Sequence, residues 1–143
     1  MSIPINNRSG EIVSQSKVEA FEDALATLPP VDLPHSNHFS QGLYCREMPI
    51  PAGVALTGKV HKQDHLAMLI KGTIKITTGG DSETLTAPAI VPSKAGVKRA
   101  IFAVTDAIFI TVHATELTDV DEIETAMVEE PRPHITEARK RLS

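Results

Sequence analysis

The middle of the chain, residues 42–114, consists of short apolar or alternating runs, each ended by glycine, proline or a polar cluster. Runs of four to eight residues at this spacing are typical of strands in an all-β barrel or sandwich. Residues 78–82 (TGGDS) indicate a hairpin loop, because adjacent glycines supply the positive φ angles of a tight turn. The expected strands are Leu43–Ile50, Val54–His61, Leu66–Lys71, Thr73–Thr78, Glu83–Ala87, Ala89–Val91, Arg99–Val104 and Ala107–His113.

Helical patterns flank this β region. Residues 14–28 carry apolar side chains at helical spacing, and Ser16–Glu19 is typical of a capping box at a helix start. The pair Pro29–Pro30 ends that helix, because proline disfavours α geometry in the residue before it. Residues 1–10 are expected to form a loose arm, and residues 29–41 a turn-rich loop.

The C-terminal part is also expected to be helical. Asp119 can cap a helix that carries Ile123 and Met127, and Pro131 and Pro133 are expected to end it. The tail from His134 to Ser143 could form one more short, exposed helix. These patterns divide the chain into an arm and helix (1–37), a β-barrel (38–116) and a helical tail (117–143).

Composition excludes several classes of function. Aromatic residues make up 3% of the 143 residues, so a surface that stacks nucleic-acid bases is not expected. The 14 basic and 18 acidic residues give a net charge of −4, which does not favour nucleic acid or anionic lipid as a partner. A single cysteine, Cys45, excludes an internal disulfide framework. With no apolar run of membrane-spanning length and no leader pattern, we expect a cytoplasmic chain.

Six histidines stand out in this sequence, and two of them, His61 and His65, lie four residues apart. Zinc proteases use this spacing on a helix, but Lys62 occupies the position of their glutamate, and the flanking residues favour strands. On a straight strand the two side chains would lie roughly 13 Å apart. A tight connection at residues 62–64 would make them a hairpin pair with Cβ atoms about 5 Å apart, close enough to share a cation.

The spacing around these histidines resembles the cupin superfamily. The first cupin motif is matched by Gly53, Lys59, His61, His65 and Gly72, all at the expected intervals. Lys59 replaces the usual first histidine, and His65 replaces the usual glutamate. The second motif is a stretched turn over residues 92–96 followed by Arg99, which occupies a ligand position but cannot bind a metal. Residues 38–124 are also similar to short cupin-like proteins of phages and prophages.

The resemblance implies a mainly-β fold: one antiparallel cupin barrel, or jelly roll, with flanking N- and C-terminal helices, paired as a homodimer. It also implies a divalent transition metal (Zn, Fe, Mn or Ni). His61 and His65 would be ligands, and His113, at the end of the last strand, could complete the site with or without Glu47. His35, His38 and His134 lie in loop or tail sequence and are expected to carry no chemistry, although His35 and His38 could cap the barrel mouth.

The sequence is consistent with two hypotheses for the function. In the first, the metal acts on a small polar or anionic molecule, Glu47 serves as acid or base, and Arg99 orients the anionic group. Lys59 and Tyr44 would add further ligand contacts. In the second, the chain only captures a small molecule, or is a dimeric interaction protein with a degenerate cupin site.

Overall fold

The computed structural model describes residues 8–140, with side chains described over residues 15–138. These residues form nine strands and three helices, and the strands make two antiparallel sheets. The strands are β1 (Ser36–Ser40), β2 (Leu43–Ile50), β3 (Ala55–Thr57), β4 (His65–Lys71), β5 (Thr73–Thr77), β6 (Glu83–Thr86), β7 (Ala89–Ser93), β8 (Ala100–Ala103) and β9 (Ala107–Ala114). The helices are α1 (Arg8–Ala26), α2 (Val120–Met127) and α3 (Pro133–Lys140).

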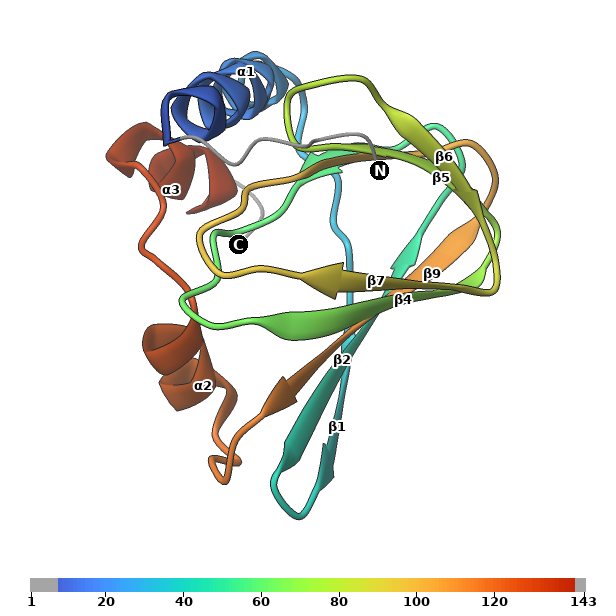
Figure 1. Ribbon diagram of the computed structural model, residues 1–143, viewed down its shortest axis with the longest axis vertical. Helices are drawn as coiled ribbons and strands as arrows, with labels where there is room; N and C mark the ends of the chain where they lie inside the picture. Colours follow the sequence, from blue (N-terminus) through green and yellow to red (C-terminus); the bar gives the residue numbers. More distant parts are fainter. Residues whose placement is uncertain (1–7, 141–143) are drawn as a thin grey trace.

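The two sheets face each other as in a jelly roll (Figure 1). One sheet has the order β1-β2-β9-β4-β7 and the other has the order β3-β8-β5-β6. β2 pairs with β9 along its whole length, from Leu43 opposite Ala114 to Ile50 opposite Ala107. The mainly-β prediction is confirmed, as is the hairpin at residues 78–82, which joins β5 to its antiparallel partner β6.

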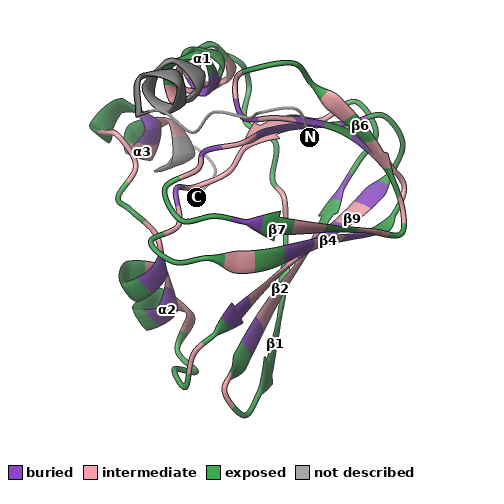
Figure 2. Ribbon diagram, in the orientation of Figure 1, coloured by how far each residue is buried: buried purple, intermediate pink, exposed green. Residues whose placement is uncertain are grey.

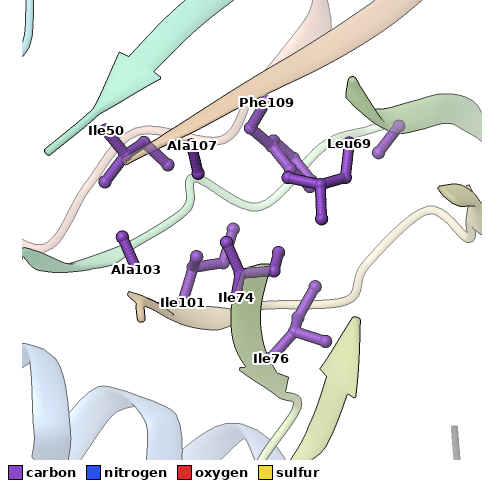
Figure 3. Close-up of a cluster of buried hydrophobic side chains, with 9 residues drawn as sticks. Ile50, Leu69, Ile74, Ile76, Ile101, Ala103, Ala107 and Phe109 are labelled. Atoms are coloured by element: carbon purple, nitrogen blue, oxygen red, sulfur yellow. The ribbon is translucent and has the colours of Figure 1, made fainter. Parts of the chain in front are cut away.

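Aliphatic side chains fill the space between the sheets (Figure 3). Alternation along each strand sends every second side chain inward, and full burial of such a side chain contributes about 1.5–3 kcal/mol. Phe109 is the one aromatic residue of this described cluster, as expected for a chain so poor in aromatics. The other members are Ile50, Ala67, Leu69, Ile74, Ile76, Ile101, Ala103 and Ala107.

Gly72 makes the connection between the sheets possible. It follows β4 of one sheet and precedes β5 of the other, with φ of +85°. A Cβ atom at this position would lie 2.2 Å from the backbone oxygen of Asp106. Glycine is therefore required here both for its conformation and for the close approach of the chain to the start of β9.

Helix α1 differs from the expected helix at its beginning. It starts at Arg8, so the Ser16–Glu19 pattern lies inside the helix and does not cap it. Gln15 instead donates a hydrogen bond to Glu19 one turn along, at 3.1 Å. The expected arm was wrong for residues 8–10, which are helical, and its residues 1–7 lie outside the described part of the chain.

Strand β1 was missed, because residues 29–41 were expected to be a loop. Ser36–Ser40 pairs antiparallel with the start of β2, ahead of the barrel boundary expected at 38. All five residues are exposed (Figure 2), so the segment shows no apolar alternation. Backbone pairing to β2 at the edge of the sheet, and not side-chain burial, makes this segment a strand.

The C-terminal helices follow the sequence pattern in part. Asp119 caps α2 by accepting a hydrogen bond from the Glu122 backbone N–H at 3.0 Å, as predicted. Pro133 begins α3, where it was expected to end a helix, because proline is well accommodated in a first helical turn. The prediction that the last helix is fully exposed was wrong at Ile135, which is 3% exposed. No helix within residues 8–140 is long and apolar enough to cross a membrane.

A buried ionic network fastens α1 to the barrel and to the segment before α3. The Glu22 carboxylate, 5% exposed, accepts hydrogen bonds from Thr57 and Arg132 and pairs with Lys98 at 3.0 Å. Arg132 also pairs with Asp23 at 2.8 Å. Burial raises the pKa of Glu22, but the hydrogen bonds from Lys98, Arg132 and Thr57 outweigh this effect and lower it overall.

Replacing Lys98 by methionine should destabilise the protein by about 2–3 kcal/mol. Breaking a buried ion pair typically costs about 3–5 kcal/mol, and here Arg132 and Thr57 still compensate the carboxylate in part. Urea unfolding measures the change. The matched control is Lys94→Met, which removes the exposed pair with Asp64 and should cost less than about 0.5 kcal/mol. Equal losses in the two variants would contradict the role of the network.

The same carboxylate predicts a pH dependence of stability. Because the folded pKa of Glu22 lies below its ordinary value of 4.5, its contribution is present above pH 4.5 and is lost as the pH falls through the folded pKa. The stability difference between the wild type and Glu22→Gln should therefore shrink as the pH falls below 4.5. Urea unfolding at pH 6, 4.5 and 3.5 measures it, and a constant difference would refute the assignment.

Candidate metal centre

Three histidines from separate places in the chain meet at one end of the barrel. His61 follows β3, His65 begins β4, and His113 lies near the end of β9. Their ring centroids are 4.1 Å apart for His61 and His65, 5.0 Å for His61 and His113, and 4.7 Å for His65 and His113. One ring nitrogen from each lies within 4.8 Å of those of the other two.

The chain brings His61 and His65 together in a different way from the one expected. The two were predicted to close a hairpin, but β3 and β4 belong to different sheets. His61 forms a bridge with Val128, and His65 pairs with Ser93 of β7. The connection between the histidines bends sharply, and Asp64 holds it by accepting a hydrogen bond from the Ala95 backbone N–H at 2.8 Å. The predicted turn is therefore present, but the predicted strand pairing is not.

A cavity of about 130 Å³ opens beside His61 and His113. One wall comes from the barrel strands and the other from α2, so the C-terminal tail is part of the site. This volume suits a small molecule and is well below the usual size of a pocket for a large cofactor. The lining residues are His35, Tyr44, Arg46, Lys59, His61, Thr111, His113, Val120, Ile123, Glu124, Met127 and Val128.

Burial disfavours the charged form of all three histidines. Burial lowers the pKa of His61 to about 3, with smaller contributions from His65 and His113. Burial lowers the pKa of His113 to about 4, and His65 and Arg46 add to the effect. The pKa of His65 is lowered by burial and then by the positive charge of Arg99. Neutral imidazole is the form that binds metal.

The donor set fits a divalent transition metal. The Nδ1 atom of His65 is buried and has no hydrogen-bond partner, which leaves a polar atom without compensation inside the protein. Three neutral imidazoles suit Zn, Fe, Ni or Mn, and three protein ligands leave a position for water or another molecule.

The other predicted ligand contacts lie near this cluster. Tyr44 lines the cavity and stacks against His113, with ring centroids 6.0 Å apart. Lys59 also lines the cavity, and its ammonium group pairs with Glu124 of α2. Arg99 does not line the cavity. Its guanidinium group donates a hydrogen bond to Ser93, the strand partner of His65.

Glu47 is not brought to the histidines. Side chains alternate along β2, so Tyr44 and Arg46 face the cavity, whereas Glu47 faces the outer side of the sheet. There its carboxylate lies 3.0 Å from Nε2 of His38. The predicted role of Glu47 as acid, base or ligand of this site is therefore not supported by its position.

Arg46 and His35 are among the cavity residues that were not predicted as site residues. Arg46 lies two residues after Tyr44 on the same face of β2, so strand alternation alone could have indicated it. His35 was expected to carry no chemistry, yet it lines the cavity from the segment before β1. No local sequence pattern predicts that His35 lines the cavity, because only the path of this segment past the barrel mouth brings it to the cavity.

Comparisons with known proteins identify the fold. No protein-family model matches the sequence, and no curated protein matches it. Among solved structures, the chain is similar to a cupin superfamily protein from Desulfitobacterium hafniense, with a TM-score of 0.51, 15% identity, and coverage of 63% of this chain and 86% of that one. KdgF from a Halomonas species gives a TM-score of 0.53 and 11% identity over 66% and 90% of the two chains.

A putative ethanolamine utilization protein Q from Salmonella typhimurium gives a TM-score of 0.52 and 12% identity, over 62% of this chain and 73% of that one. None of these three is described as a phage protein, so the similarity to phage cupin-like proteins stays a prediction. At such low identities the likeness shows the fold alone. The chain is a mainly-β protein with the jelly-roll fold of the cupins.

Proposed function

We propose that this chain is a small metal-binding protein of cupin fold. His61, His65 and His113 would hold one divalent transition metal (Zn, Fe, Mn or Ni), and the adjoining cavity would hold a small polar or anionic molecule. The observation that carries this proposal is the meeting of the buried His113 of β9 with the half-buried His61 and His65, all three with lowered pKa values. A buried polar atom without a partner is costly, and an ion shared by the three imidazoles would satisfy the unpartnered Nδ1 of His65.

The residues around the cluster suggest what a bound metal would be used for. When bound, the metal would supply Lewis acidity at the cavity wall. Tyr44 and Arg46 would position a ligand from the β2 side, and α2 would keep bulk water out. Among the described cavity residues the one carboxylate is Glu124, which is paired with Lys59. The absence of an unpaired carboxylate from this lining favours a second candidate function, capture of the small molecule without turnover.

Metal analysis tests the proposal. Protein stripped of metal, reloaded with cobalt(II) and dialysed should retain about one equivalent, because three imidazoles supply a complete set of protein ligands. The double variant His61→Ala/His65→Ala should retain less than about a tenth of that amount. The matched control, His38→Ala, removes an imidazole from the outer face and should bind like the wild type.

Several outcomes separate the candidate functions. Wild-type protein that retains no cobalt, zinc, iron, manganese or nickel would overturn the metal site. Full metal binding together with turnover of a candidate substrate would support an enzyme. Ligand capture that survives removal of the metal would support a binding protein.

We also propose that two copies of the chain pair through the outer face of the five-stranded sheet. Ile90 is 68% exposed, Ile70 50% and Leu66 47%, and all three point outward from β7 and β4. Met68, Ile108 and Val112 extend the face across β4 and β9. In these strands Glu47 is the only carboxylate that faces outward, and it lies against His38.

A second copy is the occupant that this face fits best. The exposed apolar side chains lie on three adjacent strands, β9, β4 and β7, and apolar patches of several hundred Å² typically mark interaction sites. The register also sets the exposed Lys71 opposite Ile108, so the surface that two copies would share under a two-fold axis is the apolar part of this face, packed as in a β-sandwich.

Sedimentation equilibrium measures this pairing. The wild type should sediment as a dimer, and Ile90→Lys should shift it to the monomer, because the substitution would bury an unpaired ammonium group in the interface. Val31→Lys is the control, since Val31 is also exposed but lies in the segment before β1. A monomeric wild type, or a dimer unchanged by Ile90→Lys, would refute the proposed face.

A further inference from the structure

Two arginines flank the histidine cluster without any acidic partner. The side chain of Arg46 forms no hydrogen bond or ion pair within residues 15–138, and its Nε atom is buried and unpartnered. Arg99 is half-buried, and within residues 15–138 the one hydrogen bond of its side chain goes to the neutral Ser93 hydroxyl. Burial lowers the pKa of both guanidinium groups. Arginine nevertheless stays charged, so this end of the barrel carries half-buried positive charge that no acidic side chain within residues 15–138 neutralises.

Arg46 is the arginine that faces the cavity. It lies on the same face of β2 as Tyr44, and the register sets it opposite Thr111 while Tyr44 is opposite His113. Its charge lowers the pKa of both His61 and His113, as expected for a neighbour of the cluster. The other cation of the lining, Lys59, already pairs with Glu124. An anion entering the cavity would therefore find its counter-charge at Arg46.

The wall contributed by α2 is apolar. Ile123 and Met127 are the buried residues of this helix, and they cluster with Tyr44 at the cavity. A ligand that fills the cavity thus meets a guanidinium group on one side and hydrocarbon on the other. Inorganic phosphate would satisfy only the first of these surfaces, whereas a short aliphatic carboxylate would satisfy both.

We propose that the cavity binds a small aliphatic carboxylate, with its carboxylate held by Arg46 and its hydrocarbon part packed against Ile123 and Met127. This inference rests on the proposed function in naming the ligand class of the same cavity. It does not require the metal, because the charge and the apolar wall come from the chain alone.

Calorimetric titration of metal-stripped protein, after removal of the chelator, tests the proposal in Tris chloride buffer. The probes are butyrate, its neutral analogue butyramide, acetate and inorganic phosphate. Butyrate should bind about 10- to 100-fold more tightly than butyramide, because a charge-assisted hydrogen bond is lost in the amide. Butyrate should also bind about tenfold more tightly than acetate, since two further methylene groups are buried.

Substitutions on each side of the cavity test the roles of Arg46 and of the apolar wall formed by α2. Arg46→Met should weaken butyrate binding about 10- to 100-fold, and Arg46→Lys should restore part of it. Lys75→Met, which removes one exposed positive charge from β5, is the matched control and should leave binding unchanged. Met127→Ala should reduce the preference for butyrate over acetate while leaving acetate affinity unchanged.

The possible results separate this inference from the metal site. Equal binding of butyrate and butyramide by the wild type would overturn the inference, whether or not the Arg46 variants fold. Phosphate binding as tight as butyrate binding would overturn the role of α2. Butyrate binding by a protein that fails to retain cobalt(II) would overturn the metal site and leave the carboxylate site standing. Cobalt binding without any preference for butyrate would overturn the carboxylate site and leave the metal site standing.

Discussion

The site depends on the pairing of β9 between β2 and β4. This central strand carries core residues and site residues on one face, with Phe109 among the aliphatic side chains and His113 at the cavity. Because strand side chains alternate with a period of two, a register slip of one residue would turn His113 to the outer surface. The backbone ladder therefore decides both which side chains form the core and which histidine completes the cluster.

The second determinant is the way in which α2 is attached to the barrel. The Lys62 backbone N–H donates to the Met127 carbonyl at 2.7 Å, and the Glu129 N–H donates to the Val60 carbonyl at 2.8 Å. These bonds lie on either side of His61, so the segment that carries the histidine also anchors the helix that covers the cavity. The apolar wall and the first histidine are thus positioned by the same contacts.

Much of the architecture could be predicted from local pattern, and the failures have physical causes. The bounds of β2 were predicted correctly, because alternation and flanking turns define a half-buried strand. The Asp119 cap was predicted because its chemistry is local. β1 was missed because an exposed edge strand has no apolar pattern, and the start of α1 was missed because helix propagation extended it past the capping signal.

The candidate site also has features that follow from local sequence and features that depend on the tertiary structure. By itself the sequence determined the β class of the chain, the turn between His61 and His65, and the opposite faces of Arg46 and Glu47, because turn chemistry and strand alternation act over a few residues. Only the tertiary structure decided that His113 joins the other two histidines, that Glu47 meets His38, and that α2 closes the cavity beside Arg46. These contacts join residues far apart in the chain, and the order and register of the strands place them together.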